Sequence, residues 1–314
     1  MIKVAKLILY ITFFCSIFGR NVTFAESDIP TVRIGIFTRS LSFVPYMVAK
    51  SKGWWEEALA PYGATVEYTE FQSLPSINEA FASDRLDVVF EAEAPAIIGR
   101  AAGIDIKLKR MASSHIQRMI VQNDPAIKSI KDLRGKKIAL LAGSSSHYGV
   151  NHLLVQNGLS AKDVEIIDMH PADAKAAFDS KQISAWGIWP PYPEQELLAG
   201  NGKTLPKGKY LIQAGVIFRG AFEREHPEVT KDLLKVVRKS QNWIVAHPAE
   251  ARSLVAKEFN LPLAVIEKAW PTLNFHPKVG RAEIRDLQNK ADFLYDSKFV
   301  KRRVDVAKEL LELQ

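Results

Sequence analysis

A strand, a tight turn and a helix follow one another between residues 126 and 156. A charged, turn-rich lead ends at Gly135, an apolar run covers residues 138–142, and Gly143 stops that run. A helical pattern then begins with Ser144, Ser145, Ser146 and His147. The first backbone N–H groups of a helix have no intrahelical partners, and the helix dipole adds positive potential there. The segment therefore predicts either a site for a small oxyanion or a well-capped helix of an ordinary α/β protein.

The N-terminus has the order of a secretory signal peptide. Lys3 and Lys6 precede an apolar run over residues 7–18, and a short polar region leads to Ala25, the expected last residue before cleavage. The apolar run is too short to span a bilayer. We therefore expect residues 1–25 to be removed and the mature chain to be exported. No later segment holds 18 consecutive apolar residues, so no membrane span is predicted.

The one cysteine of the chain, Cys15, falls within this predicted signal peptide. Phe13 and Phe14 precede it, where a lipidation site would need small residues, so lipidation is not expected. The mature chain then has no disulfide and no thiol nucleophile, which suits an exported protein that is large enough to be held together by its core.

Charge gives no indication of nucleic-acid binding. The formal net charge is +7, and the three cations of the predicted signal peptide account for part of it. The remaining charges are scattered, and the densest cluster, Lys301, Arg302 and Arg303, is expected on a solvated face of a C-terminal helix. A mild positive balance can still attract anionic ligands.

Strand and helix patterns alternate along most of the chain. Such alternation predicts an α/β fold with mostly parallel sheets covered by helices. The expected strands are 32–37, 64–71, 87–90, 106–111, 138–142, 164–168, 184–188 and 211–218. The expected helices before residue 220 are 44–52, a short helix that starts at Trp54 and Trp55, 76–83, 94–102, 144–156 and 172–180. From residue 227 onward the pattern is almost entirely helical and is interrupted at Pro248, Pro262 and Pro271.

Several catalytic and metal motifs are missing from the sequence. It contains no GxxxxGK[ST], no GxGxxG after a strand, no CxxC and no HExxH. His147 and His152 are five residues apart, which does not place two metal ligands on one helical face. We therefore expect neither a metal nor a cofactor.

A series of short motifs, in order, resembles one known family. Residues 46–54 read YMVAKSKGW, residues 92–95 read AEAP with Ala101, Ala102 and Gly103 behind them, and residues 127–138 read IKSIKDLRGKKI. Residues 143–148 read GSSSHY, and residues 171–174 read PADA, followed by WGIWPPY at 186–192. Together they resemble the periplasmic solute-binding proteins of ABC importers in the sulfonate, taurine and nitrate group, and most closely the aliphatic sulfonate binders.

This resemblance implies a periplasmic binding protein fold of type II, with two α/β lobes joined by two crossover strands that act as a hinge. Lobe one would hold residues 26–112 and 219–314, and lobe two would hold residues 113–218. A small anionic ligand would be clasped between the lobes of a monomer and delivered to a membrane permease and its ATPase. The resemblance implies a binding protein rather than an enzyme.

Four loops at the carboxyl ends of strands are expected to form the ligand site. The first contains Thr38, Arg39 and Ser40, whose hydroxyls and guanidinium suit two oxygens of a sulfonate. The second contains Glu91, Ala92 and Glu93, and helix capping is the alternative role for Glu93. The third contains Ser144, Ser145, Ser146 and His147, at the oxyanion end. The fourth contains Trp189 and Tyr192, with Trp189 against an alkyl or aryl tail and Trp186 in the core.

Two departures from the family pattern bear on the ligand. Pro190 stands where relatives commonly have Asp, which argues against a ligand amine such as that of taurine. Glu91 stands where the family has a small residue, and it would repel an anion unless it pairs with Arg39 or with a positive group of the ligand. The open alternatives are a binder of nitrate, taurine or a thiamine-precursor pyrimidine, or an enzyme on the same fold.

Overall fold

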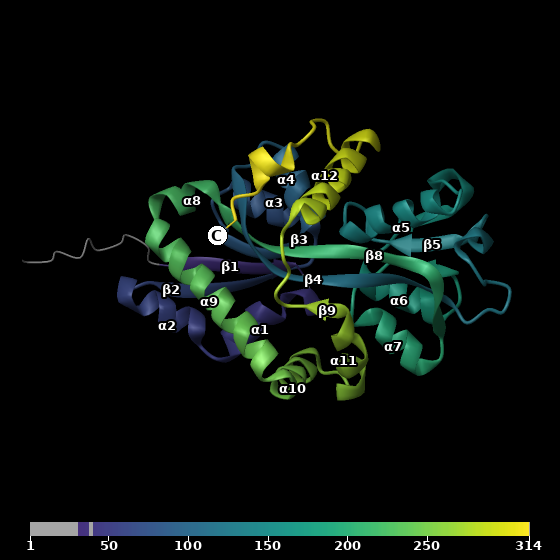
Figure 1. Ribbon diagram of the computed structural model, residues 1–314, viewed down its shortest axis with the longest axis horizontal. Coiled ribbons are helices and arrows are strands. Elements are labelled where there is room, and N and C mark those ends of the chain that lie inside the picture. Colours follow the sequence, from purple (N-terminus) through teal and green to yellow (C-terminus); the bar gives the residue numbers. More distant parts are fainter. Residues whose placement is uncertain (1–30, 38–39, 314) are drawn as a thin grey trace, which may run out of the picture.

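The computed structural model describes residues 31–37 and 40–313, so the predicted signal peptide lies outside it. Within these ranges nine strands form one sheet, in the order β2-β1-β3-β8-β4-β7-β5-β6, and β9 pairs with β4. The strands are β1 Thr31–Phe37, β2 Thr65–Phe71, β3 Val88–Ala92, β4 Ile106–Gln122, β5 Lys137–Leu140, β6 Glu165–Asp168, β7 Ala185–Trp186, β8 Gly202–Arg219 and β9 Leu273–Asn274. Figure 1 shows β4 and β8 running along the molecule through both of its halves.

The sheet consists of two similar halves that share β4 and β8. In one half β2, β1 and β3 are parallel, and in the other β6, β5 and β7 are parallel. The long strands pair antiparallel with each other and with the inner strand of each half, β8 with β3 and β4 with β7. The predicted α/β class is confirmed, and each half combines three parallel strands with an antiparallel pair.

The two crossover strands are much longer than predicted from the sequence. Residues 106–111 and 211–218 were expected as strands, whereas β4 and β8 have 17 and 18 residues. The predicted strand 106–111 stopped short of the end of β4 because polar side chains such as Ser113, His115 and Gln117 interrupt the apolar pattern. These three side chains are nevertheless buried.

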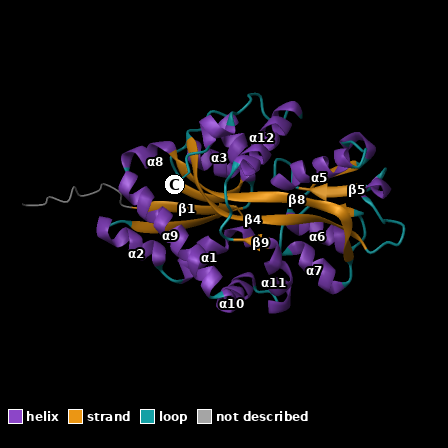
Figure 2. Ribbon diagram, viewed as in Figure 1, coloured by secondary structure: helices purple, strands orange, loops and turns teal. Residues whose placement is uncertain are grey.

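Helices cover both faces of the sheet, as Figure 2 shows. In the first half, α1, α2, α9 and α10 pack on the face that carries Val32, Ile34 and Phe90, and α3, α4 and α12 pack on the opposite face. The helices before residue 200 are α1 Val44–Ser51, α2 Trp54–Leu59, α3 Leu74–Ala82, α4 Glu93–Ala101, α5 Ser145–Gln156, α6 Pro171–Asp179 and α7 Tyr192–Ala199. The later ones are α8 Gly220–Glu225, α9 Pro227–Ala246, α10 Pro248–Phe259, α11 Leu263–Ala269 and α12 Arg281–Asp296.

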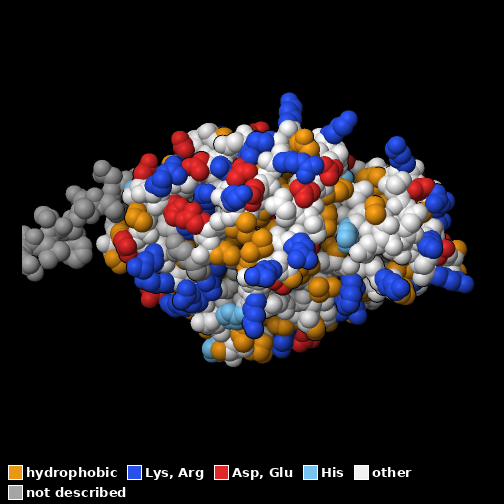
Figure 3. All heavy atoms as spheres, turned by 45° about the horizontal axis from the view of Figure 1, so that its top comes forward, with side chains coloured by type: hydrophobic (Ala, Val, Ile, Leu, Met, Phe, Trp, Pro, Cys, Tyr) orange, Lys and Arg blue, Asp and Glu red, His pale blue; other side chains and the backbone are white. Residues whose placement is uncertain are grey.

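The C-terminal basic cluster differs from the prediction. Residues 301–305 are not helical. Arg302 pairs with Glu309, and Arg303 pairs with Asp292 and Asp296. Figure 3 shows cationic and anionic side chains intermixed on the face that it presents, in agreement with scattered charge. Across the part of the chain that the structure describes, no helix is long and apolar enough to cross a membrane.

Candidate functional site

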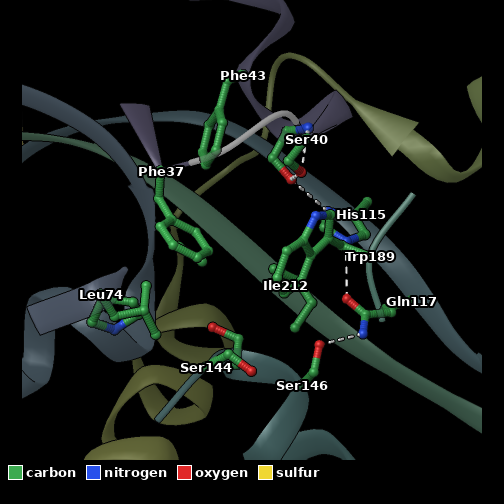
Figure 4. Close-up of a pocket in the computed structure, with 14 residues that line it drawn as sticks. Phe37, Ser40, Phe43, Leu74, His115, Gln117, Ser144, Ser146, Trp189 and Ile212 are labelled. Carbon is green, nitrogen blue, oxygen red and sulfur yellow. Dashed lines mark hydrogen bonds between the residues drawn. The ribbon is translucent and has the colours of Figure 1, made fainter. Parts of the chain in front are cut away.

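A cavity lies between the two halves of the molecule, where β1, β3 and β5 end and β4 and β8 cross. The cavity is small, with a volume of about 30 Å³ for the centres of water-sized spheres. Fourteen described residues line it: Phe37, Ser40, Ser42, Phe43, Leu74, Ala92, Pro95, His115, Gln117, Ser144, Ser145, Ser146, Trp189 and Ile212. Figure 4 shows these side chains converging from both halves. The lining within the described residues contains no Asp, Glu, Lys or Arg, so its polar groups are uncharged when His115 is neutral.

The N-terminus of α5 forms the polar end of this cavity. Ser144 is the N-cap, and its Oγ accepts from the backbone N–H of His147 at 3.3 Å and donates to Leu141 O at 2.7 Å. Ser145 and Ser146 supply the first two N–H groups of the helix, which have no intrahelical partners. Gly149 lies one turn later, where an added Cβ would come within 2.0 Å of the Tyr210 ring. The glycine therefore lets β8 approach α5 closely.

A chain of hydrogen bonds runs through the cavity wall from one half to the other. Ser40 Oγ donates to Ser42 Oγ at 3.1 Å, and Ser42 Oγ lies 3.3 Å from His115 Nδ1. His115 Nε2 lies 3.4 Å from Gln117 Oε1, and Gln117 Nε2 donates to Ser146 Oγ at 2.7 Å and also to Tyr210 Oη. Burial lowers the pKa of His115 to about 4, so its ring is neutral near pH 7.

The remaining wall is apolar and aromatic. Phe37 and Trp189 meet edge to face with ring centroids 5.9 Å apart, and Phe43, Leu74 and Ile212 extend this surface. Trp189 is 8% exposed, and its indole Nε1–H has no hydrogen-bond partner among the described residues. A buried donor without a partner is costly, so this N–H marks a place where a ligand acceptor would fit.

The structure holds the two halves in contact around the cavity. Leu41 N donates to Pro190 O at 3.3 Å, and Ala94 N approaches Ser145 Oγ at 3.5 Å. Each contact joins a segment of the first half to a segment of the second. The two halves therefore touch each other beside the cavity.

Six of the predicted site residues line the cavity. They are Ser40, Ala92, Ser144, Ser145, Ser146 and Trp189. Thr38 and Arg39 lie outside the described residues. The expected core position of Trp186 agrees with its exposure of 1%.

The two predicted glutamates do not line the cavity. Glu93 begins α4, but its carboxylate pairs with Lys290 of α12 and accepts from Gln213 N at 3.0 Å. Glu91 is 0% exposed, and both of its carboxylate oxygens lack a hydrogen-bond partner within the described residues. Burial raises the pKa of Glu91 to about 8.

His147 and Tyr192 also lie away from the cavity. The His147 ring packs edge to face against Phe293 and Phe299, at centroid distances of 5.7 and 5.6 Å. Tyr192 packs on Trp186 at 5.5 Å. Both residues adjoin lining residues in the sequence, which is why they were predicted for the site. Their side chains, however, extend in a different direction from those of the neighbours that line the cavity.

His115 and Gln117 line the cavity but were not predicted from the sequence as site residues. A signal for them existed, because Ser113, His115 and Gln117 alternate along one strand and must share a face. Polar residues at every second position of an otherwise apolar strand indicate that one face of the strand lines a polar site.

Within the described ranges, no group of three or more His, Cys, Asp or Glu side chains is arranged to hold a metal ion. The donors that meet in the cavity are hydroxyls, an amide, an indole N–H and helix N–H groups. Such a set can hold an anion by hydrogen bonds.

Comparison with known proteins places the chain in a family. Residues 40–251 match the family model described as NMT1/THI5 like. A protein of Bacillus subtilis (strain 168), provisionally named an aliphatic sulfonates-binding protein, is 34% identical over 90% of this chain and 86% of its own length. The taurine-binding periplasmic protein of Escherichia coli (strain K12) is 28% identical over 59% of both chains.

A solved structure shows the same fold. The alkanesulfonate-binding protein SsuA from Xanthomonas axonopodis pv. citri, bound to MOPS, superposes with a TM-score of 0.76 at 22% identity. The match covers 91% of this chain and 99% of that one. The architecture is thus the periplasmic binding protein fold, and by its sequence this chain belongs to the NMT1/THI5-like family, together with proteins named for binding aliphatic sulfonates.

Proposed function

We propose that this chain is the extracytoplasmic solute-binding component of an ABC importer and that it captures an alkyl or aryl sulfonate. The observation that carries the proposal is the two-sided cavity, with uncharged hydrogen-bond donors at one end and aromatic and aliphatic walls elsewhere. The relatives named for sulfonate and taurine binding support the ligand class. They are named as binding proteins, which favours transport over catalysis.

The sulfonate oxygens would lie at the N-terminus of α5. Ser145 and Ser146 offer hydroxyl and backbone N–H donors, and the Trp189 indole N–H offers another. The helix dipole adds positive potential at this end. A sulfonate presents three acceptor oxygens and a single negative charge, so it matches several neutral donors without requiring a paired cation.

The tail would lie against Phe37, Phe43 and Leu74. These side chains bury apolar surface, which contributes roughly 25 cal/mol for each Å² removed from water. A protonated amine on the tail would find no carboxylate among the described residues of the lining. Pro190, which stands where relatives commonly have Asp, offers only its carbonyl, and that group already accepts from Leu41 N. The proposed ligand therefore has no amine.

We further propose that residues 26–112 with 219–314 form one lobe and residues 113–218 the other, with β4 and β8 as the hinge. The contact of Leu41 with Pro190 would break when the lobes separate. Residues 1–25 would direct export to the periplasm, where a monomer would present its closed form to the permease and its ATPase. Small-angle scattering should show a smaller radius of gyration with ligand than without, and an unchanged radius would argue against closure.

A thermal-shift screen of the chain from Glu26 tests the ligand class. The panel holds alkyl and aryl sulfonates, taurine, nitrate, dicarboxylates and pyrimidines. A ligand at 100 times its dissociation constant stabilises the folded state by about 2.7 kcal/mol. Sulfate and an alcohol with the same tail are the matched controls, because each carries one half of the proposed ligand. A shift only with sulfonates that lack an amine supports the proposal, and a shift only with another class refutes the sulfonate assignment.

A further inference from the structure

Two aromatic rings of the first half lie against the first turn of α5, which belongs to the second half. Phe293, on α12, packs edge to face on His147 and on Tyr148, with ring centroids 5.7 and 5.4 Å apart. Phe299, which follows α12, packs edge to face on His147 at 5.6 Å. Figure 1 shows α12 beside α5 at the boundary between the halves. None of these four side chains lines the cavity, so contact with a ligand does not explain the arrangement.

The turn before α5 leaves space for Phe299. Gly143 has a φ of +75°, and an added Cβ at this position would come within 2.8 Å of the Phe299 ring. A glycine therefore serves both the left-handed backbone and the close approach of the ring. His147 Nδ1 accepts from the backbone N–H of Gly143 at 3.3 Å, so the imidazole that both phenylalanines contact is itself fixed to this turn.

The first half does not enclose either phenylalanine ring by itself. Phe299 is 41% exposed and Phe293 is half-buried even with the second half in contact. If the halves separated, both rings would lose their partners on α5 and more of their apolar surface would meet water, which is unfavourable. The two rings thus favour the arrangement in which the halves touch.

We propose that Phe293 and Phe299 are positioning residues that latch the two lobes together when a ligand is bound. The inference rests on the proposed function, because it requires lobes that separate. The latch acts through the turn of α5 that carries Ser145 and Ser146, and it holds this turn against Ala94 of the first half, whose N–H lies 3.5 Å from Ser145 Oγ. A protein whose binding-competent state is less populated binds its ligand more weakly, so loss of the latch lowers affinity without removing a ligand contact.

Isothermal titration calorimetry with ethanesulfonate measures the effect on the dissociation constant. One edge-to-face pair corresponds to roughly a 2- to 10-fold change in Kd. Phe299→Ala removes one such pair and should raise Kd by this factor. The double variant Phe293→Ala with Phe299→Ala removes all three pairs and should raise Kd by roughly 10- to 100-fold. Most of the change should appear as faster ligand dissociation in stopped-flow measurements, because the latch forms after the ligand has entered.

The stability of the ligand-free chain separates a latch from a structural role. With the lobes apart, Phe299 has no partner on α5, so Phe299→Ala should unfold in urea at the same midpoint as the wild type. Leu313→Ala is the matched control, because Leu313 is also 41% exposed and lines a groove of the first half; it should keep the wild-type Kd. His147→Ala removes the partner ring from the opposite side, and in its presence Phe299→Ala should have little further effect on Kd.

Two results would overturn the latch. One is an unchanged Kd in both Phe299→Ala and His147→Ala. The other is a lower urea midpoint of ligand-free Phe299→Ala, because the ring would then support the fold and not closure. If the double phenylalanine variant does not fold by circular dichroism, the cycle of Phe299→Ala with His147→Ala decides alone. If the wild type binds another compound of the thermal-shift panel and no sulfonate, the sulfonate assignment fails, and the same Kd ratios measured with that compound decide the latch.

Discussion

The buried carboxyl of Glu91 makes a prediction about stability and pH. It is 0% exposed, its oxygens have no hydrogen-bond partner among the described residues, and burial raises its pKa from 4.5 to about 8. Such a group is protonated in the folded state near pH 7 but ionised in the unfolded chain. The variant Glu91→Gln removes this titration and keeps a side chain of nearly the same size.

The magnitude follows from proton linkage. Below pH 4.5 Glu91 is protonated in both the folded and the unfolded state, so it does not make stability depend on pH. As the pH rises from 4.5 to 8 the unfolded state releases its proton first, and stability falls. Each pKa unit is worth 1.36 kcal/mol. Between pH 5 and pH 8 the free energy of unfolding of the wild type should therefore fall by roughly 3 kcal/mol, and that of Glu91→Gln should not show this fall.

Urea unfolding at several values between pH 5 and pH 8 measures this difference. Any constant cost of burying the amide of Gln cancels when only the pH dependence is compared. Glu267→Gln, at an exposed position of α11, is the control and should follow the wild type. If Glu91→Gln and the wild type lose the same stability between pH 5 and pH 8, the carboxylate is already ionised in the folded state, as it would be if paired with Arg39, and the reasoning is refuted.

Much of the fold could be predicted because helix and strand periods are local. The expected helices at 144–156 and 172–180 correspond to α5 and α6 within one residue at each end. The crossover strand β4 was predicted too short because its buried face is polar at the cavity, and β8 because Gly, Pro and Lys interrupt the apolar pattern over residues 202–209. A pattern of apolar residues detects a strand that passes through a core, and it fails where the strand passes a ligand site.

The partners of the acidic residues could not be predicted from the sequence. Glu93 pairs with Lys290, which is far along the chain and equally buried. Lys290 also pairs with Asp286 at 2.7 Å and donates to Leu211 O at 2.9 Å. This network depends on where α12 packs against α4, which is set by the tertiary structure and not by the local sequence. Proximity along the chain suggested a place for Glu93 in the site, whereas the structure shows its carboxylate beside Lys290 and Gln213 N.

Three further predictions concern the site and its support. Replacing Ser145 and Ser146 by Ala should weaken sulfonate binding by roughly 1–3 kcal/mol in sum, and unchanged affinity by calorimetry would move the anion elsewhere. Trp189→Phe should remove most of any ligand-induced change in tryptophan emission, and a full signal in the variant would contradict its place at the cavity. Lys290→Met should lower the free energy of unfolding in urea by about 3–5 kcal/mol, because it leaves Glu93 buried and unpaired; adding Glu93→Gln should restore part of the loss.

The described part of the cavity lining offers uncharged hydrogen-bonding groups. A buried lysine or arginine would pair with the anion at close range, and in a site without water such a pair opposes release. Hydrogen bonds from hydroxyls, an amide and helix N–H groups are individually weaker, and the groups come from both halves of the molecule, as the contacts of Ser42 with His115 and of Ala94 N with Ser145 Oγ show. Separation of the halves would therefore weaken many of them together. A neutral donor site thus couples ligand affinity to lobe closure, which a solute-binding protein requires if the permease is to take its ligand.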